Sequence, residues 1–236
     1  MHTGKILGVE ALIRWQTADK ELLLPGQFLP YIENKAISIK LGEWVINAAL
    51  KQMHDWQKIG VELPVSLNIS TYHFLQPNFT KRLTEILDAY PPIPHQLLEL
   101  ELLGLKVLND LTKMSQTIEN CRSKGIQVAL DNFGTGSSSL AYLTHFNVNT
   151  LKIDQKIVLN MLKQEKAFRI IGSIIDLANN FNLNVIASGV ATEKHGLALM
   201  ELGCNIGQGY AISPPLSAKE LLSWCKTWRP YPSWLK

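Results

Sequence analysis

Several polar side chains of this sequence stand in or directly after short β-rich runs, and their types suit metal or phosphate chemistry. Residues 128–140 read Val-Ala-Leu-Asp-Asn-Phe-Gly-Thr-Gly-Ser-Ser-Ser-Leu, so an apolar stretch ends in Asp131 and continues through Asn132 into a glycine-rich turn. Carboxylate and amide oxygens are suitable ligands for hard divalent cations. An isolated Asp before a turn is nevertheless more often a cap or part of an Asx turn. Both interpretations of Asp131 stay open at this point.

Other β-rich runs carry comparable groups at corresponding places. These groups are Glu10, Arg14, Asn68, Glu101, Lys152 and Gln208. Each has an ordinary explanation when taken alone, because Lys152 would lie on the surface, Asn68 would bond local backbone and Glu101 would face solvent. One polar group on nearly every run is hard to explain by coincidence, which suggests that these side chains converge on one site.

The elements that must position these groups alternate between strands and helices. Alternating or continuous apolar patterns predict strands at 6–15, 64–70, 97–103, 126–131, 150–154, 184–188 and 205–212. Helical spacing predicts helices at 37–58, 79–90, 109–124, 138–145, 165–181, 193–202 and 217–227. This alternation is typical of an α/β fold with a largely parallel sheet. A closed barrel is favoured over an open sheet because no glycine-rich dinucleotide fingerprint follows an early strand.

Composition sets limits on the partners. The 236 residues are 46% hydrophobic and 18% charged, which is enough to bury a sizeable core, and the net charge of +3 is too small to indicate nucleic acid as the main partner. The three cysteines show no ligand-like spacing and are expected to be reduced thiols. We expect no membrane-spanning segment within this chain and a cytoplasmic location.

Seven short motifs, in order along the chain, resemble those of the EAL domain family, the cyclic di-GMP phosphodiesterases of bacteria. The motifs are "GVEALIRW" (8–15), "LNIS" (67–70), "LELE" (98–101), "ALDNFGTGSSSLAYL" (129–143), "LKID" (151–154), "IASGVATE" (186–193) and "GQGYAIS" (207–213). The resemblance implies a modified TIM-type (β/α)8 barrel in which one early strand runs antiparallel. Most of that strand, the hairpin partner of the Glu-Ala-Leu strand, is missing here. The expected unit is a single EAL-like domain over 1–236, either the C-terminal part of a longer signalling protein or a barrel short of one strand, and both leave a strand edge unpaired.

The resemblance also implies roles for the polar groups. It implies that Glu10, Asn68, Glu101 and Asp131 are ligands of a first Mg²⁺ or Mn²⁺ ion. Arg14 matches a residue that contacts a substrate phosphate, a role that suits a guanidinium. Lys152 matches a lysine near the attacking water, and Gln208 matches a residue at the rim of the metal site.

Four positions depart from the family pattern, and each departure removes a carboxylate. Asn132 replaces the second Asp of the loop, Ser188 replaces the general base, and Ala191 and Gly104 replace two further Glu residues. The second metal position and the base are therefore lost, and with Arg14 and Lys152 counted, the remaining site charge is about −1. At most one ion is expected. Without the base and second ion, hydrolysis should be slower by about 10³-fold or more.

Three functions stay open. The leading hypothesis is a hydrolysis-deficient EAL domain that works as a cyclic di-GMP receptor or a protein-interaction module, with a homodimer, a protein partner or an upstream regulatory domain as further expectations. The alternative is a weak metal-dependent cyclic di-GMP phosphodiesterase that uses one ion with Lys152. A third is a scaffold that binds only protein, for which the aromatic residues Trp224, Trp228, Tyr231 and Trp234 offer a surface, although packing against the barrel is the commoner arrangement.

Overall fold

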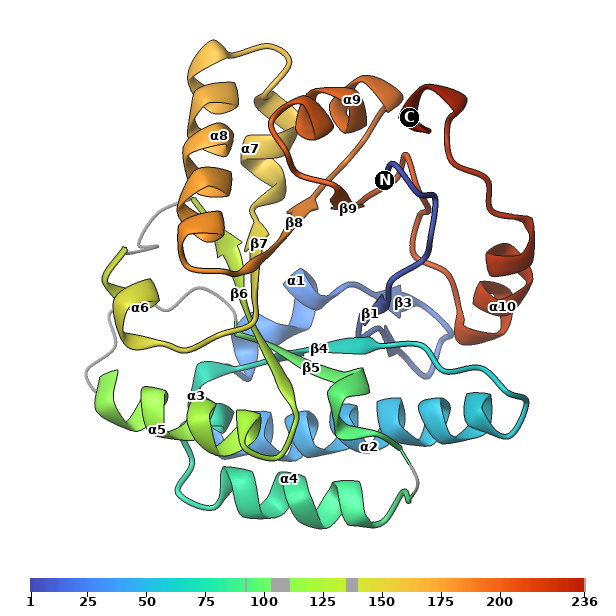
Figure 1. Cartoon of the computed structure of the whole chain (residues 1–236). Helices are drawn as coiled ribbons and strands as arrows, with labels where there is room; N and C mark the ends of the chain where they lie inside the picture. Colours follow the sequence, from blue (N-terminus) through green and yellow to red (C-terminus); the bar gives the residue numbers. More distant parts are fainter. Residues whose placement is uncertain (92, 103–110, 135–139, 236) are drawn as a thin grey trace. The chain divides into compact units, whose positions relative to one another are not determined.

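The computed structural model describes residues 1–91, 93–102, 111–134 and 140–235 (Figure 1). The chain divides into two compact units. The N-terminal unit comprises residues 8–103 and 108–128, and the C-terminal unit comprises residues 1–7, 104–107 and 129–236. Strand β6 (Gln127–Phe133) begins in the first and ends in the second. Each unit is described below by itself.

Three parallel strands form the sheet of the N-terminal unit. They are β1 (Val9–Ala11), β4 (Val65–Ile69) and β5 (Leu98–Leu102), with β4 in the middle. In β4, Val65, Leu67 and Ile69 are buried while the residues between them are half-buried, as the alternation of the sequence predicts. Residues 1–8, all of them described, form only turn and coil and contain no strand.

Helices cover the apolar face of these strands. The long helix α2 (Ala36–Gln57) packs on β4 and on α4 (Phe79–Asp88), as Figure 1 shows, and α4 in turn contacts α5 (Leu111–Arg122). The buried residues of α2 recur at intervals of three and four, as expected of a helix with one face against a sheet. They are Ile46, Ala49, Leu50, Met53 and Trp56.

Short elements of this unit were not expected from the sequence. They are the hairpin strands β2 (Trp15–Gln16) and β3 (Leu22–Leu23), helices α1 (Pro25–Phe28) and α3 (Thr71–Phe74), and 3-10 turns at Leu29–Tyr31 and His95–Leu97. Segments of two to four residues are too short to show a period of 2 or 3.6.

The C-terminal unit contains β6, β7 (Thr150–Ile153), β8 (Asn184–Ser188) and β9 (Ile206–Gln208), paired in parallel in that order. Its helices are α6 (Leu140–His145), α7 (Gln155–Asn160), α8 (Glu165–Asn180), α9 (Glu193–Glu201) and α10 (Ala218–Thr227), and a 3-10 helix η3 spans Pro232–Trp234. Helix α8 packs on α7, β7 and β8 through Ile171, Ile174 and Ile175.

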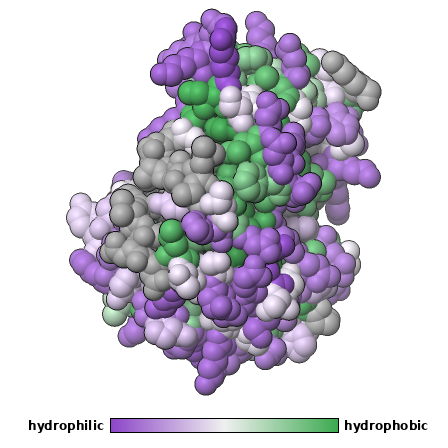
Figure 2. Space-filling view, turned by 60° about the vertical axis from the view of Figure 1, so that its left-hand side comes forward, coloured by the Kyte–Doolittle hydropathy of each residue, from purple (hydrophilic) through white to green (hydrophobic). Residues whose placement is uncertain are grey.

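All seven predicted strands are present, and the alternation of strands and helices confirms the α/β class. The first and last are shorter than predicted, at Val9–Ala11 instead of 6–15 and Ile206–Gln208 instead of 205–212. Within the described residues, no helix combines the length and the apolar character needed to cross a bilayer. The face drawn in Figure 2 carries many hydrophilic side chains and also exposes a group of apolar ones.

All three cysteines are free thiols, which agrees with the expected reduced state. Burial raises the pKa of the Cys121 thiol to about 12 and that of Cys204 to about 11. Both thiols therefore stay protonated near neutral pH and are poor nucleophiles and poor metal ligands.

Candidate functional site

One face of the β1–β4–β5 sheet carries polar side chains at neighbouring register positions. Ser66 of β4 is paired with Glu10 of β1 on one side and with Glu99 of β5 on the other. Two residues further along β4, Asn68 is paired with Glu101 of β5. Residues paired in register point to the same face of a sheet. The sequence-predicted residues Glu10, Asn68 and Glu101 are therefore brought together on one face of the N-terminal unit, near the carboxyl ends of its strands.

The environments of these three residues differ. Glu101 is almost completely buried, with 1% of its surface exposed, whereas Glu10 and Asn68 are half-buried. The amide Nδ2 of Asn68 donates a hydrogen bond of 2.6 Å to Glu10 Oε1. This bond turns the amide nitrogen of Asn68 toward Glu10. Two carboxylates and one amide oxygen on adjacent strands are a donor set that suits a hard divalent cation.

Arg14 follows β1 in the same unit. Its guanidinium is half-buried and donates to the carbonyl oxygen of the preceding residue, Ile13, at 2.8 Å. This contact holds the side chain near the backbone of the Glu-Ala-Leu motif. The phosphate contact expected for Arg14 stays a prediction.

The strand ends of the C-terminal unit bring together the remaining predicted residues. Leu130 of β6 is paired with Leu151 of β7, and Phe133 with Ile153, so the ladder shifts between these pairs. Two residues, Asp131 and Asn132, therefore stand opposite the single residue Lys152, which is a β-bulge. Lys152 is only 2% exposed, which excludes the alternative of an ordinary surface lysine.

The backbone at the bulge explains which residues can stand there. Asn132 has φ = +56°, in the left-handed region. Among residues with a side chain, Asn and Asp enter this region most readily because their short polar groups can bond locally. An Asp at position 132 would therefore fit the same backbone, so the fold does not force the loss of the acid.

Ser188 and Gln208 lie opposite one another in the β8–β9 ladder, and Lys152 is paired with Ile186, two residues before Ser188. Lys152, Ser188 and Gln208 thus share one face of the sheet. Ala191, where the motif resemblance leads us to expect an acid, is exposed in the loop after β8.

The loop after β8 is held by backbone hydrogen bonds. The amides of Gly189 and Val190 both donate to the carbonyl of Gln208, at 2.8 and 2.9 Å, and the Ala211 amide donates to the Val190 carbonyl at 2.9 Å. Gly209 has φ = +153°, and a Cβ there would lie 2.4 Å from the Val190 nitrogen. Only glycine allows this approach, so the glycines of "GQGYAIS" keep the loop close against β9.

Asp154 of the "LKID" motif has a structural role that the sequence reasoning did not assign. It is 6% exposed, and its Oδ1 accepts a hydrogen bond of 2.6 Å from the Lys156 amide as the N-cap of α7. The signal for this role was present, since Asp directly before a helix is a preferred N-cap. Gly104 and most of the glycine-rich turn after Phe133 lie outside the described residues.

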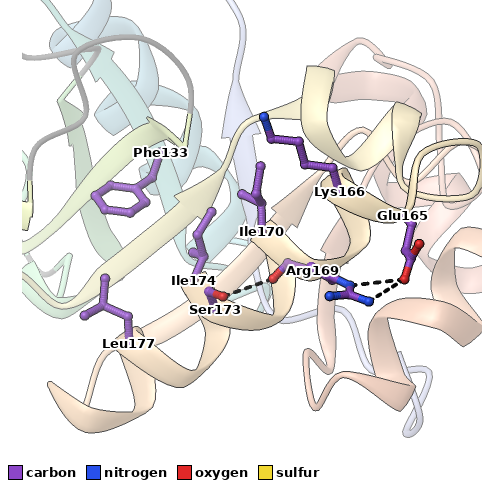
Figure 3. A pocket seen from close by; sticks show the side chains of 8 residues that line it. All are labelled: Phe133, Glu165, Lys166, Arg169, Ile170, Ser173, Ile174 and Leu177. Carbon is purple, nitrogen blue, oxygen red and sulfur yellow. Dashed lines mark hydrogen bonds and ion pairs between the residues drawn. The ribbon is translucent and has the colours of Figure 1, made fainter.

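A surface pocket of about 790 Å³ lies along α8, and none of the predicted site residues lines it (Figure 3). Its lining combines Phe133 with seven residues of α8, and the charged groups among them include Arg169, which is paired with Glu165 at 2.6 Å. The candidate site is therefore defined by strand ends and not by this pocket.

The metal-ligand set divides between the two units. Glu10, Asn68 and Glu101 belong to the N-terminal unit and Asp131 to the C-terminal unit. In the portion of the chain that the structure describes, no group of three or more His, Cys, Asp or Glu residues forms a metal site by itself. The complete four-residue set stays a prediction.

The comparison with known families identifies the class of protein. The EAL domain model matches residues 1–215. The chain therefore belongs to the EAL domain family, as its motifs predicted. One curated relative is the cyclic di-GMP phosphodiesterase PdeR of Escherichia coli strain K12, which is 33% identical over 94% of this chain and 34% of its own length.

Solved structures confirm the EAL-type fold. A structure of the PaMucR phosphodiesterase in a c-di-GMP complex has a TM-score of 0.85 at 31% identity, covering 91% of this chain and 87% of that one. A structure of the EAL enzyme Bd1971 in its cAMP- and cyclic-di-GMP-bound form has a TM-score of 0.86 at 32% identity, covering 92% of this chain and 59% of that one. The chain spans about a third of the length of the curated relatives it matches, between 27% and 38%.

Proposed function

We propose that this chain binds cyclic di-GMP and hydrolyses it very slowly or not at all, so that it serves as a receptor or a protein-interaction module in cyclic di-GMP signalling. The observation that carries the proposal is the unequal loss of carboxylates. The Glu10–Asn68–Glu101 face retains all its expected ligands, whereas positions 132, 188 and 191 are Asn, Ser and Ala.

The chemistry of the retained groups fits at most one Mg²⁺ or Mn²⁺ ion. Glu10, Asn68, Glu101 and Asp131 would be its ligands, and the bound ion would polarise a phosphoryl oxygen. Ser188 has no useful basicity near neutral pH, and Asn132 offers a neutral oxygen where a second ion needs a charged one. Two-metal hydrolysis needs paired ions to stabilise the attacking and leaving oxygens, and in this chain the second ion would lack charged ligands.

Binding of the ligand is less affected than its cleavage. The guanidinium of Arg14 is suited to a phosphate oxygen, and a site charge near −1 repels a doubly charged cyclic dinucleotide only weakly. The PaMucR and Bd1971 structures described above contain the cyclic dinucleotide. Their similarity to this chain supports the choice of ligand.

The burial of Lys152 favours the alternative, a weak metal-dependent phosphodiesterase. Lys152 is a buried lysine, 2% exposed, opposite Asp131 and Asn132, and it occupies the position expected near the attacking water. This alternative requires cleavage that depends on Mg²⁺ or Mn²⁺ and is lost in Glu10→Ala.

One calorimetric titration, followed by product analysis, distinguishes the candidates. We expect heat of binding with cyclic di-GMP, a marked loss of affinity in Arg14→Ala, and unchanged affinity in the control Arg169→Ala, whose guanidinium lies outside the motifs. Incubation with Mn²⁺ should leave the ligand intact over many hours. Metal-dependent release of linear product would establish the phosphodiesterase, and the absence of binding heat under all metal conditions would establish a protein-only scaffold.

The expectations on assembly and location belong to the same proposal. We propose one EAL-type domain over 1–236, a homodimer, a cytoplasmic location in a bacterium, and coupling to a protein partner or an upstream regulatory domain. Sedimentation equilibrium with and without cyclic di-GMP tests the dimer directly.

A further inference from the structure

Residues 228–235, here called the C-terminal strap, are held on α9 by specific contacts. Trp234 is fully buried, with 0% of its surface exposed. Its indole Nε1 donates to the carbonyl oxygen of Glu193 at 3.0 Å, and the hydroxyl of Ser233 donates to the Glu193 carboxylate. Tyr231 packs against the indole with ring centroids 4.8 Å apart. Figure 1 accordingly shows the end of the chain beside α9.

Helix α9 contains a notch that matches the indole of Trp234. Gly196 lies in the middle of the helix, and a Cβ at this position would lie 2.4 Å from Trp234 Cε2 and Cζ2. Real Cβ atoms do not approach other atoms this closely, so the indole can lie here only because position 196 has no side chain. Glycine is otherwise unfavourable inside a helix. The notch therefore gives the strap a defined docking position.

The other end of the strap is anchored separately. The indole Nε1 of Trp228 donates to the carbonyl oxygen of Gly4 at 3.1 Å, and a Cβ on Gly4 would lie 2.6 Å from the Pro230 ring. All these residues belong to the C-terminal unit. The strap is thus fixed near both of its ends within one compact unit.

The strap contacts the residue at which the site loop enters α9. Residues 189–192 connect β8 to Glu193, the first residue of α9, and Glu193 receives strap hydrogen bonds on both its carboxylate and its carbonyl. At its start, the same loop is tied to Gln208 by the Gly189 and Val190 amides. The loop is therefore fixed to β9 at one end and to the strap at the other.

We infer that the C-terminal strap is a positioning device, in which Trp234 docked in the Gly196 notch holds the first turn of α9 and thereby the loop from Ser188 to Ala191. Trp234 acts through the loop, because its described contacts are with Glu193, Gly196 and Tyr231. The strap's positioning role stands independently of any ligand. Its effect on cyclic di-GMP affinity rests on the proposed function.

Amide hydrogen exchange in the absence of ligand tests the positioning. In Trp234→Ala, we expect the Gly189 and Val190 amides to exchange about tenfold faster, since removing the anchor makes local opening easier. The Leu183 amide, bonded to Ala178 before the start of β8, should keep its rate. The control Ile171→Ala removes a buried side chain of α8 in the same unit. An equal acceleration at Gly189 and Val190 in this control would show general destabilisation and overturn the inference.

The change in Tm caused by Gly196→Ala provides a second test, because its sign should differ between two backgrounds. Alanine at a helix interior normally raises Tm. Gly196→Ala should instead lower Tm in the wild-type chain, because the new methyl group displaces Trp234, and should raise Tm in the Trp234→Ala background, where the notch is empty. An increase in Tm in both backgrounds would refute the docking of Trp234. Trp234→Phe keeps an aromatic ring but loses the hydrogen bond to Glu193, so its Tm should lie between those of wild type and Trp234→Ala.

Calorimetry then connects the strap to the ligand. If the loop contributes to binding, Trp234→Ala should weaken cyclic di-GMP binding by about fivefold, because a smaller fraction of molecules holds the loop in the bound position. Equal affinity in wild type and variant would show that the strap does not influence cyclic di-GMP binding. Failure of the wild-type chain to bind would refute the proposed function, while the exchange and Tm results would still decide the positioning.

Discussion

The strand ends of both units carry polar side chains, but the two sets differ in how many expected carboxylates they contain. In the N-terminal unit, Glu10, Asn68 and Glu101 are all retained, and a 2.6 Å hydrogen bond joins the first two. In the C-terminal unit, the bulge at Asn132 and the glycine-supported loop at Ser188 are well formed, yet they present neutral side chains. Under the proposed function, a backbone can be kept while its catalytic groups are exchanged.

Restoring the acids of the C-terminal unit should have the largest effect. The combined variant Asn132→Asp, Ser188→Glu, Ala191→Glu and Gly104→Glu should raise cyclic di-GMP cleavage by about 10³-fold, or about 4 kcal/mol of transition-state stabilisation, because a base and a second cation position return. Product formation with Mn²⁺ measures it. Adding Glu10→Ala to the same variant should abolish the gain. No gain at all would show that more than ligands has been lost.

Breaking the retained face should come next in size. Asn68→Ala removes one hydrogen-bond donor from the half-buried Glu10 carboxylate and should cost about 1 kcal/mol of unfolding free energy. Urea denaturation measures the cost, and a titration with Mn²⁺ should show weaker binding. Ser66→Ala, on the same face of the same strand, is the matched control. Equal losses in both variants would contradict a special role for the Glu10–Asn68 pair.

The bulge itself can be probed through position 132. Asn132→Ala should destabilise the fold by about 1 kcal/mol, because alanine is disfavoured at φ = +56°, whereas Asn132→Asp and Asn132→Gly should be tolerated. The midpoint of urea unfolding reports these differences. Asn179→Ala, on the exposed surface of α8, serves as the control and should be neutral or slightly stabilising. A harmless Asn132→Ala would argue against the left-handed backbone.

The smallest effect concerns pH and the N-terminal unit alone. Burial lowers the pKa of His73 below its ordinary value of 6.5, although Glu43 acts in the opposite direction. As pH falls through 6.5, the unfolded chain binds a proton that the folded chain rejects, so the free energy of unfolding should decrease. Above this range His73 contributes no pH dependence. Chemical unfolding of wild type and His73→Gln between pH 5 and 8 should show a shallower slope in the variant, and parallel slopes would exclude His73 as the cause.

The sequence predicted the fold where the signal is local and repeated. The alternation of "PVSLNIS" located β4 and its two faces, because a period of 2 survives any tertiary context. The spacing of apolar residues located α2 and α8 almost to the residue. The hairpin at Trp15–Gln16 and Leu22–Leu23 was missed, since two-residue strands contain no period.

The sequence could name candidate site residues but not their arrangement. The motif positions identified Asp131, Asn132 and Lys152 as a group, yet the bulge that sets two of them against the third depends on pairing between strands distant in sequence. The burial of Trp234 was anticipated only as the commoner arrangement for such aromatics. Its notch could not be foreseen, because Gly196 and Trp234 are far apart in the chain.

The left-handed conformation of residue 132 has an evolutionary consequence. Because the strand holds either an amide or a carboxylate there without strain, a lineage can exchange one for the other without first remodelling its scaffold. Domains that hydrolyse a nucleotide and domains that only bind it can then share one backbone and differ by a few side-chain atoms.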